Sequence, residues 1–216
     1  MSIYSFYAHS LTSFVLLRSV ELSIVELKAQ LNPLLTACFN DCLISSNEKI
    51  RQSLSVRLAL QELLKQLGLP IVLLVKDENG RPFLKNDNLH ISFSHTRYLV
   101  SVALSTAFQV GIDIETTRPQ LAVVQSKILT KEESEHVGNS LDKLAIYWCA
   151  KEALYKCLMN QQSCNFQKIF VEPFQLQIEG HILAHFSGKK YLMHYKRIDC
   201  DINKPPHFCV CCEGHT

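Results

Sequence analysis

The segment from Val110 to Glu115 alternates apolar and acidic residues, and this pattern constrains the fold more than any other part of the chain. Successive side chains of a β-strand point to opposite faces, so the segment predicts a strand that buries one face and points Asp113 and Glu115 out of the other. Two adjacent carboxylates repel each other, and a hard divalent cation is the economical way to keep both ionised. We therefore predict a magnesium site at this strand.

A second motif, from Trp148 to Lys156, joins an aromatic residue to several charges. Helical spacing predicts that Trp148, Lys151, Glu152 and Lys156 lie on roughly one face. This face would add a third carboxylate and two ammonium groups to the strand. Taken separately, the acidic residues also fit the solvent side of an edge strand, and Glu152 with Lys156 also fits a solvated i,i+4 pair.

Composition places few limits on function. The chain has 216 residues, 47% of them hydrophobic and 19% charged, as expected for a folded protein with a substantial core. Its formal net charge of +2 predicts no nucleic-acid partner. The most apolar runs, 11–20 and 67–75, are too short to span a membrane, and the N-terminus lacks the pattern of a secretory signal. We therefore expect a cytoplasmic protein without a membrane partner.

Nine cysteines are scattered along the sequence, and their odd number argues for reduced thiols over a disulfide framework. The tail contains His207, Cys209, Cys211, Cys212 and His215, which raises the alternative of a zinc-binding interaction domain. The period of two between Cys209 and Cys211 instead favours the buried face of a terminal strand. We retain the strand as the prediction.

Both halves of the chain mix strands with one long helix, and no linker separates them. In the first half we expect an early strand and its return within 3–17, helices over 23–31 and 47–67, and strands at 71–75, 89–93 and 98–104. The longer helix would be capped by Asn47, would carry Ile50, Leu54, Leu58 and Leu64 on one stripe and would end at Gly68.

In the second half, Thr130 and Glu133 have the spacing of a capping box, and Ser140 marks the start of the motif helix. We expect further strands at 169–178, 181–186 and 191–195. The sequence therefore predicts an α+β protein with domains 1–105 and 106–216.

The two motifs together resemble the signature of the 4′-phosphopantetheinyl transferases, specifically the longer surfactin-type enzymes. The resemblance rests on the segments 111–115 and 148–152 with Lys156, supported by 80–82 and 92–96, and it extends from about Arg51 to Phe174. It implies two similar lobes related by a pseudo-twofold axis, each with a small mainly antiparallel sheet on a long helix, and a cofactor cleft between them. It also implies a monomer.

The implied activity is that of a holo-acyl-carrier-protein synthase, which transfers 4′-phosphopantetheine from coenzyme A to a serine of an acyl or peptidyl carrier protein. By resemblance, Asp113, Glu115 and Glu152 bind Mg²⁺, while Lys156 lies near the phosphates and assists the leaving group. Lys151 would be a second phosphate contact. Glu152, directly or through water, would accept the serine proton.

Further cofactor contacts are expected in the first half. The resemblance implies that Ser94 and His95 face the phosphates of coenzyme A and that Arg81 replaces a lysine that is common in the family. Arg57 lies within an apolar stripe, where pointing at the core would be costly, so we expect it to bind a phosphate. A surface arginine with a buried stem is the alternative.

Two further functional alternatives stay open. Three acids and two lysines also suit another magnesium-dependent phosphate-transfer or hydrolysis enzyme. A non-catalytic carrier-binding module is the second alternative, although all three acids and Lys156 are present. The identity of the carrier is not encoded in any motif of the chain.

Overall fold

The protein is described by a computed structural model over residues 3–7, 12–40, 42, 44, 46–86, 88–158, 166–201 and 203–214, with only the backbone described for 3–7. The chain divides into two compact units, Met1–Ala107 and Phe108–Thr216. Each unit combines helices with antiparallel strands, which confirms the predicted α+β class. The helices of the described part do not combine the length and apolar character that crossing a membrane requires.

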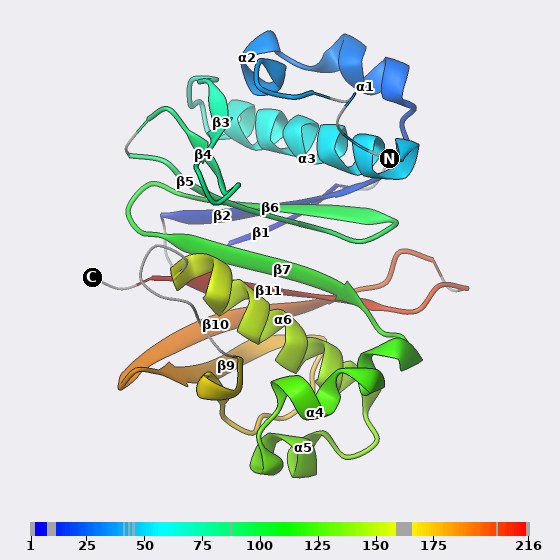
Figure 1. The fold of residues 1–216 in the computed structure, drawn as a ribbon, viewed down its shortest axis with the longest axis vertical. Helices are drawn as coiled ribbons and strands as arrows, with labels where there is room; N and C mark the ends of the chain where they lie inside the picture. Colours follow the sequence, from blue (N-terminus) through cyan, green and yellow to red (C-terminus); the bar gives the residue numbers. More distant parts are fainter. Residues whose placement is uncertain are drawn as a thin grey trace. The chain divides into compact units, whose positions relative to one another are not determined.

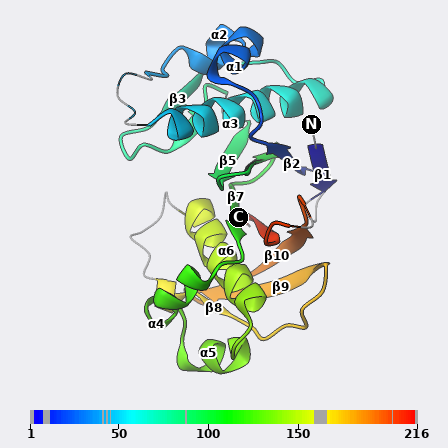
Figure 2. The ribbon, with the colours of Figure 1, turned by 90° about the vertical axis from the view of Figure 1, so that its right-hand side faces the viewer.

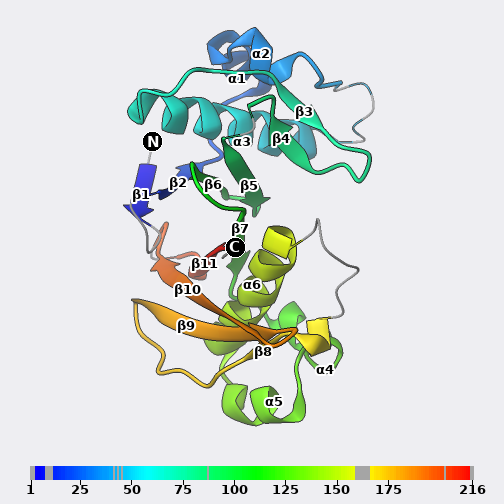
Figure 3. The ribbon, with the colours of Figure 1, turned by 90° about the vertical axis from the view of Figure 1, so that its left-hand side faces the viewer.

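The described residues of the first unit form a four-stranded sheet, a hairpin and three α-helices (Figure 1). Its elements are β1 (Ile3–Tyr7), β2 (Ser13–Ser19), α1 (Ile24–Gln30), α2 (Pro33–Thr36), α3 (Asn47–Gln66), β3 (Leu74–Lys76), β4 (Pro82–Leu84), β5 (His90–His95) and β6 (Leu99–Ser105). The sheet has the order β1-β2-β6-β5, and every neighbouring pair is antiparallel. Within the described part of the chain, β3 and β4 pair only with each other, and Figure 3 shows this hairpin beside α3.

The helix α3 is buried on two sides, whereas the sequence predicted one apolar stripe. Leu60 and Leu64 pack on the sheet through Leu16 and Val102. Leu54 and Leu58 pack on α1 through Leu27 and Leu31. In Figure 1, α1 and α2 accordingly lie on the side of α3 that faces away from the sheet.

The boundaries of α3 follow from local chemistry. The helix begins one residue after Ser46, whose Oγ accepts a hydrogen bond from the backbone N of Lys49 at 3.2 Å. The predicted cap at Asn47 is therefore wrong by one residue. At the other end, Gly68 adopts φ +66°, which ends the helix as predicted because only glycine takes this conformation at little cost.

The second unit contains a five-stranded sheet with the order β7-β11-β10-β9-β8, also antiparallel throughout. Its elements are β7 (Val110–Thr116), the 3₁₀ helix η2 (Pro119–Val123), α4 (Gln125–Ile128), α5 (Lys131–Val137), α6 (Leu141–Leu158), the 3₁₀ helix η3 (Phe166–Lys168), β8 (Phe170–Val171), β9 (Glu179–Phe186), β10 (Lys189–Ile198) and β11 (His207–Glu213). Figure 2 shows α6 lying along this unit, with α4 and α5 at one end.

The core of the second unit lies between α6 and one face of its sheet. Ala150 and Leu154 of the helix pack with Met193 of β10 and with Phe208 and Val210 of β11. The predicted strand over 169–178 shortens to the two residues of β8, because the chain then leaves the sheet and returns only at β9. The capping box of Thr130 and Glu133 is confirmed at the start of α5.

The cysteine-rich tail forms β11, as the period of two predicted. Cys212 joins the core against α6, whereas Cys209 and Cys211 point to the other face of the strand and all three are buried. No group of three potential metal ligands occurs in the described part of the chain, and His215 lies outside that part. The described part of the tail forms β11, which lies between β7 and β10 in the sheet.

Gly111 allows α6 to approach β7 closely. A Cβ atom at this position would lie 1.9 Å from the carbonyl oxygen of Ala153 and 2.7 Å from the backbone N of Cys157. Real Cβ atoms do not approach backbone so closely, so any larger residue would push the helix away from the strand.

We expect Gly111→Ala to reduce the free energy of unfolding by about 3 kcal/mol or more, because the added methyl group meets rigid backbone. Urea denaturation followed by circular dichroism would measure the loss. Gly180→Ala is the matched control, since its Cβ would meet only side-chain atoms of Tyr195, at 3.0 Å or more. Equal losses at the two positions would contradict the close approach at Gly111.

His207 begins β11 and is fully buried, and burial together with Lys204 lowers its pKa to about 4. The folded state disfavours the protonated imidazole of His207. The contribution of neutral His207 to the free energy of unfolding is therefore fully present above pH 6.5 and is lost as the pH falls toward 4. Between pH 6.5 and 4, we expect the His207→Gln protein to lose less of its free energy of unfolding than the wild type does, by on the order of 2 kcal/mol. Urea titrations of both proteins from pH 7 to 4 would test this, and parallel curves would contradict it.

Candidate functional site

Asp113 and Lys156 form the centre of the candidate site. The Nζ atom of Lys156 donates to Oδ1 of Asp113 at 2.6 Å and to the carbonyl oxygen of Ile112 at 3.1 Å. Asp113 is only 6% exposed, so the sequence was wrong to place its side chain on a free face. Asp113 shares a face with Gly111, which contacts α6, and Lys156 compensates the charge that this burial would otherwise leave unpaired.

Glu152 lies one helical turn before Lys156 and is half-buried. Burial raises the pKa of its carboxyl group, the negative charge of Asp113 raises it further, and Lys156 opposes the shift. Asp113 therefore interacts electrostatically with two groups of α6, the carboxyl of Glu152 and the ammonium of Lys156. A carboxyl group with a raised pKa is a better proton acceptor than a solvated glutamate.

Glu115 follows Asp113 on the same face of β7 but makes different contacts. Its Oε2 accepts a hydrogen bond from Nη2 of Arg118 at 3.1 Å, and its Oε1 accepts one from the backbone N of Thr116 at 2.7 Å. Arg118 was not anticipated from the sequence. It supplies Glu115 with a positive partner from the chain itself.

The three acids offer only oxygen donors, which suit Mg²⁺. The negative charge of Asp113 raises the pKa of Glu152, and this repulsion fits a pair that holds a cation. However, no group of three or more potential ligands gathers within the residues that the structure describes. The chemistry of Asp113 and Glu152 fits a magnesium ion, and binding of the ion by any of the three acids stays a prediction.

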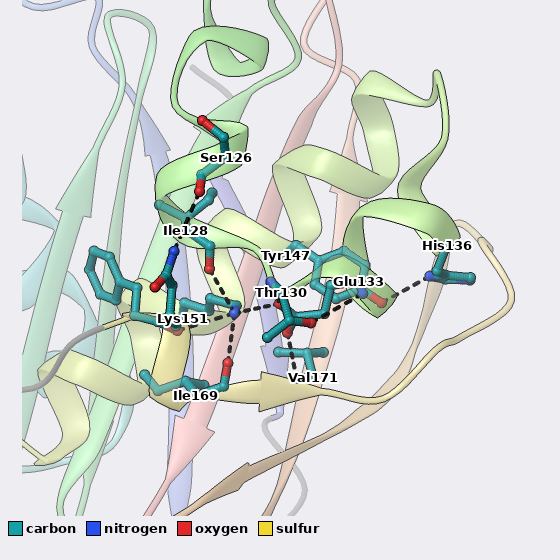
Figure 4. Close-up of polar contacts among 11 residues, drawn as sticks. Ser126, Ile128, Thr130, Glu133, His136, Tyr147, Lys151, Ile169 and Val171 are labelled. Atoms are coloured by element: carbon teal, nitrogen blue, oxygen red, sulfur yellow. Dashed lines mark hydrogen bonds and ion pairs between the residues drawn. The ribbon is translucent and has the colours of Figure 1, made fainter.

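Lys151 occupies a different environment from the one predicted. It is 1% exposed, and its Nζ donates to Oε2 of Glu133 at 2.7 Å and lies within 2.6–3.1 Å of three backbone carbonyl oxygens (Figure 4). An ammonium group has three N–H donors, so four oxygen neighbours leave none for a phosphate. Residue 151 lies about 100° around α6 from Glu152 and faces the interior, and the phosphate contact that the resemblance implies for it stays a prediction.

Arg57 of α3 is also turned inward. Its Nε donates to the carbonyl oxygen of Leu35 at 3.0 Å, its Nη1 donates to Oγ of Ser53 at 2.6 Å, and its guanidinium lies 4.7 Å from the ring centre of Phe39. Burial lowers its pKa to about 10. These contacts hold Nε and Nη1 of Arg57 within the first unit, and the side chain is buried, unlike the surface alternative. The predicted phosphate contact of Arg57 stays a prediction.

Arg81, Ser94 and His95 belong to the first unit. Arg81 follows the β3–β4 turn, where its backbone N donates to Oδ1 of Asp77 at 2.8 Å. Ser94 and His95 end β5, with Ser94 half-buried and His95 exposed. The predicted role of Arg81, Ser94 and His95 at the phosphates of coenzyme A stays a prediction.

Residues 109–209 match the model of the 4′-phosphopantetheinyl transferase superfamily. The matched segment is slightly less than half of the chain and includes β7, α6 and all three acids with Lys156. No curated protein matches the chain. The match supports a transferase of the phosphopantetheinyl type in general.

Glu133 is the principal residue whose role the sequence did not reveal. Its capping-box position was visible, but a capping box is normally a local and exposed feature. In the structure its side chain is completely buried and pairs with Lys151, which lies 18 residues further along the chain. No local pattern indicates such a pairing.

We expect Lys156→Met to cost about 1–3 kcal/mol of stability, because the change leaves the carboxylate of Asp113 buried without its ammonium partner. The free energy of unfolding at pH 7 would be measured by urea denaturation. Lys131→Met is the control, since Lys131 pairs with Glu135 on an exposed surface at 3.9 Å, and exposed pairs contribute little. A loss no larger than that of the control would contradict a stabilising pair at Asp113.

Proposed function

We propose that this protein transfers the 4′-phosphopantetheine group of coenzyme A to a serine of an acyl or peptidyl carrier protein in a magnesium-dependent reaction. The observation that carries the proposal is the grouping of Asp113 with Glu152 and Lys156 inside the segment that matches the superfamily. The surfactin-type branch is the member of the superfamily that we favour, because the resemblance begins at about Arg51, well before the matched segment.

The proposed reaction is an in-line displacement at phosphorus. The serine Oγ of the carrier forms a bond to the phosphorus that bears the pantetheine arm, and the bond from this phosphorus to the bridging pyrophosphate oxygen breaks. Adenosine 3′,5′-bisphosphate leaves with the bonding electrons. No oxidation or reduction is involved, so catalysis reduces to positioning the two oxygens, handling one proton and stabilising charge.

Each residue of the group then has a role. The ammonium of Lys156 stabilises the negative charge that grows on the leaving oxygen. The carboxylate of Glu152, with its raised pKa, accepts the serine proton. Asp113 orients Lys156, and together with Glu152 it would bind the magnesium ion, with Glu115 as a further ligand. When bound, the ion supplies additional charge stabilisation and orients the pyrophosphate.

Asp113→Ala and Glu152→Ala are each expected to lower the rate of transfer by a factor on the order of a hundred or more, because each removes a charge at the reacting phosphate. Intact mass spectrometry of an apo carrier, incubated with the protein, coenzyme A and Mg²⁺, would measure the gain of one phosphopantetheine, with EDTA as a control. Circular dichroism would verify that the variants fold. A fully active Asp113→Ala protein would refute the assignment of the site.

The same assay separates the alternative functions. Consumption of coenzyme A without a carrier would indicate a hydrolase. Binding of coenzyme A or a carrier without transfer to any of several unrelated carriers would indicate a non-catalytic module.

A further inference from the structure

The pair formed by Lys151 and Glu133 is the most completely buried ion pair of the second unit among the pairs that the structure describes, with side chains 1% and 0% exposed. Besides Lys151, Glu133 accepts hydrogen bonds from two backbone N–H groups, that of Thr130 at 2.7 Å and that of Val171 at 2.8 Å. Burying two charges is costly unless both are fully hydrogen-bonded, and here both are. Such a pair holds its surroundings in one geometry.

Three chain segments converge on this pair (Figure 4). Lys151 comes from α6, and Glu133 and the carbonyl of Ile128 come from the α4–α5 region. The carbonyls of Phe166 and Ile169 come from η3 and from the residue that precedes β8. The ammonium approaches the carbonyl oxygens of Ile128, Phe166 and Ile169 at 2.9, 3.1 and 2.6 Å. One side chain therefore fixes α6 to segments on both sides of it in the sequence.

The rotation of α6 about its axis determines where its catalytic face points. Lys151 and Lys156 lie five residues apart, which separates them by about 140° around the helix. On one side, Lys156 reaches Asp113 at 2.6 Å, and on another, Lys151 reaches Glu133 at 2.7 Å. The backbone of Ala153, which lies between the two lysines in the sequence, contacts Gly111. A helix held at these three points cannot rotate without breaking one of them.

We propose that Glu133 and Lys151 are positioning residues of the site, which set the rotation of α6 and thereby hold Glu152 and Lys156 against Asp113. The effect on transfer rests on the proposed function, whereas the effect on the helix does not. The residues act through α6 and make no contact with coenzyme A. A well-packed apolar pair could stabilise the fold equally well. We therefore attribute the charged pair to fixing the rotation of α6 and not to stability alone.

The proposal is tested with Lys151→Met, the milder Glu133→Gln and the double variant. Each single change is expected to lower kcat for carrier modification on the order of tenfold or more, because small displacements of catalytic groups are costly. The dissociation constant of coenzyme A should stay within about twofold of the wild-type value, since only the step at phosphorus is disturbed. The double variant should be no slower than the slower single variant, since both changes remove the same interaction.

Glu62→Gln is the matched control. Glu62 of α3 pairs with the buried Arg18 of β2, so the change removes the same charge from another pair between elements, far from β7 and α6 in the sequence. At a temperature below the unfolding midpoint of every variant, the control should keep the wild-type kcat. A loss of kcat in the control equal to that of Glu133→Gln would show that any damaged ion pair slows the enzyme, which would overturn a specific positioning role.

Trp148 provides a second readout that does not need activity. It is the single tryptophan of the chain, it lies three residues before Lys151, and its ring centre is 6.2 Å from that of Phe166, whose carbonyl binds Lys151. We expect Lys151→Met and Glu133→Gln to shift its fluorescence emission to longer wavelength and to increase quenching by acrylamide. Glu62→Gln should leave both unchanged.

The outcomes are distinct. If Glu133→Gln keeps the wild-type kcat and emission while Lys151→Met weakens the binding of coenzyme A, Lys151 is a phosphate contact and the positioning proposal is overturned. If the wild-type protein modifies no carrier, the proposed function fails. The emission of Trp148 then still decides whether the pair holds α6, and an unchanged emission in both variants would refute it.

Discussion

The contact between Gly111 and the backbone of α6 is the constraint on which the candidate site depends. Because position 111 has no side chain, the carbonyl of Ala153 occupies space that a Cβ atom would need. The helix therefore lies directly on β7, and the next residue on the same face of the strand, Asp113, meets Lys156. A wider spacing would leave Asp113 with neither its ammonium partner nor its electrostatic influence on Glu152. The glycine is thus as important to the chemistry as the charged residues, although it contributes no functional group.

Two of the three lysines of α6, Lys151 and Lys156, lie in contrasting environments. Lys156 reaches the edge of a half-buried group of charges, where it donates to Asp113 and limits the rise in the pKa of Glu152. Lys151 is buried in the interior, where its ammonium group contacts Glu133 and three backbone carbonyl oxygens. Residues only five positions apart can serve such different purposes because the helix directs them to different neighbours. In the proposed transferase, one lysine acts on the substrate and the other maintains the geometry that makes this action possible.

Much of the secondary structure was accessible from periodicity and capping signals. The helices α1, α3 and α6, the capping box of α5 and most strands lie close to their predicted positions, because their signals are local. The errors have identifiable physical causes. The strand after Ile169 is short because the chain leaves the sheet, and α3 buries two faces because α1 covers the side opposite the sheet. The short segments α2, η2 and α4 were not predicted, since elements of four or five residues give little periodic signal.

The sequence by itself determined the acidic strand, the charged helix and their order, and from these the type of chemistry that the chain resembles. It could do so because residue identity and spacing along one element are local properties. Only the tertiary structure decided which charges meet. It assigned Lys156 to Asp113, Lys151 to Glu133, Arg118 to Glu115 and Arg57 to an internal carbonyl. These pairings depend on the distance and rotation between elements that are separate in the sequence, and those are set by packing and by the need to compensate buried charge.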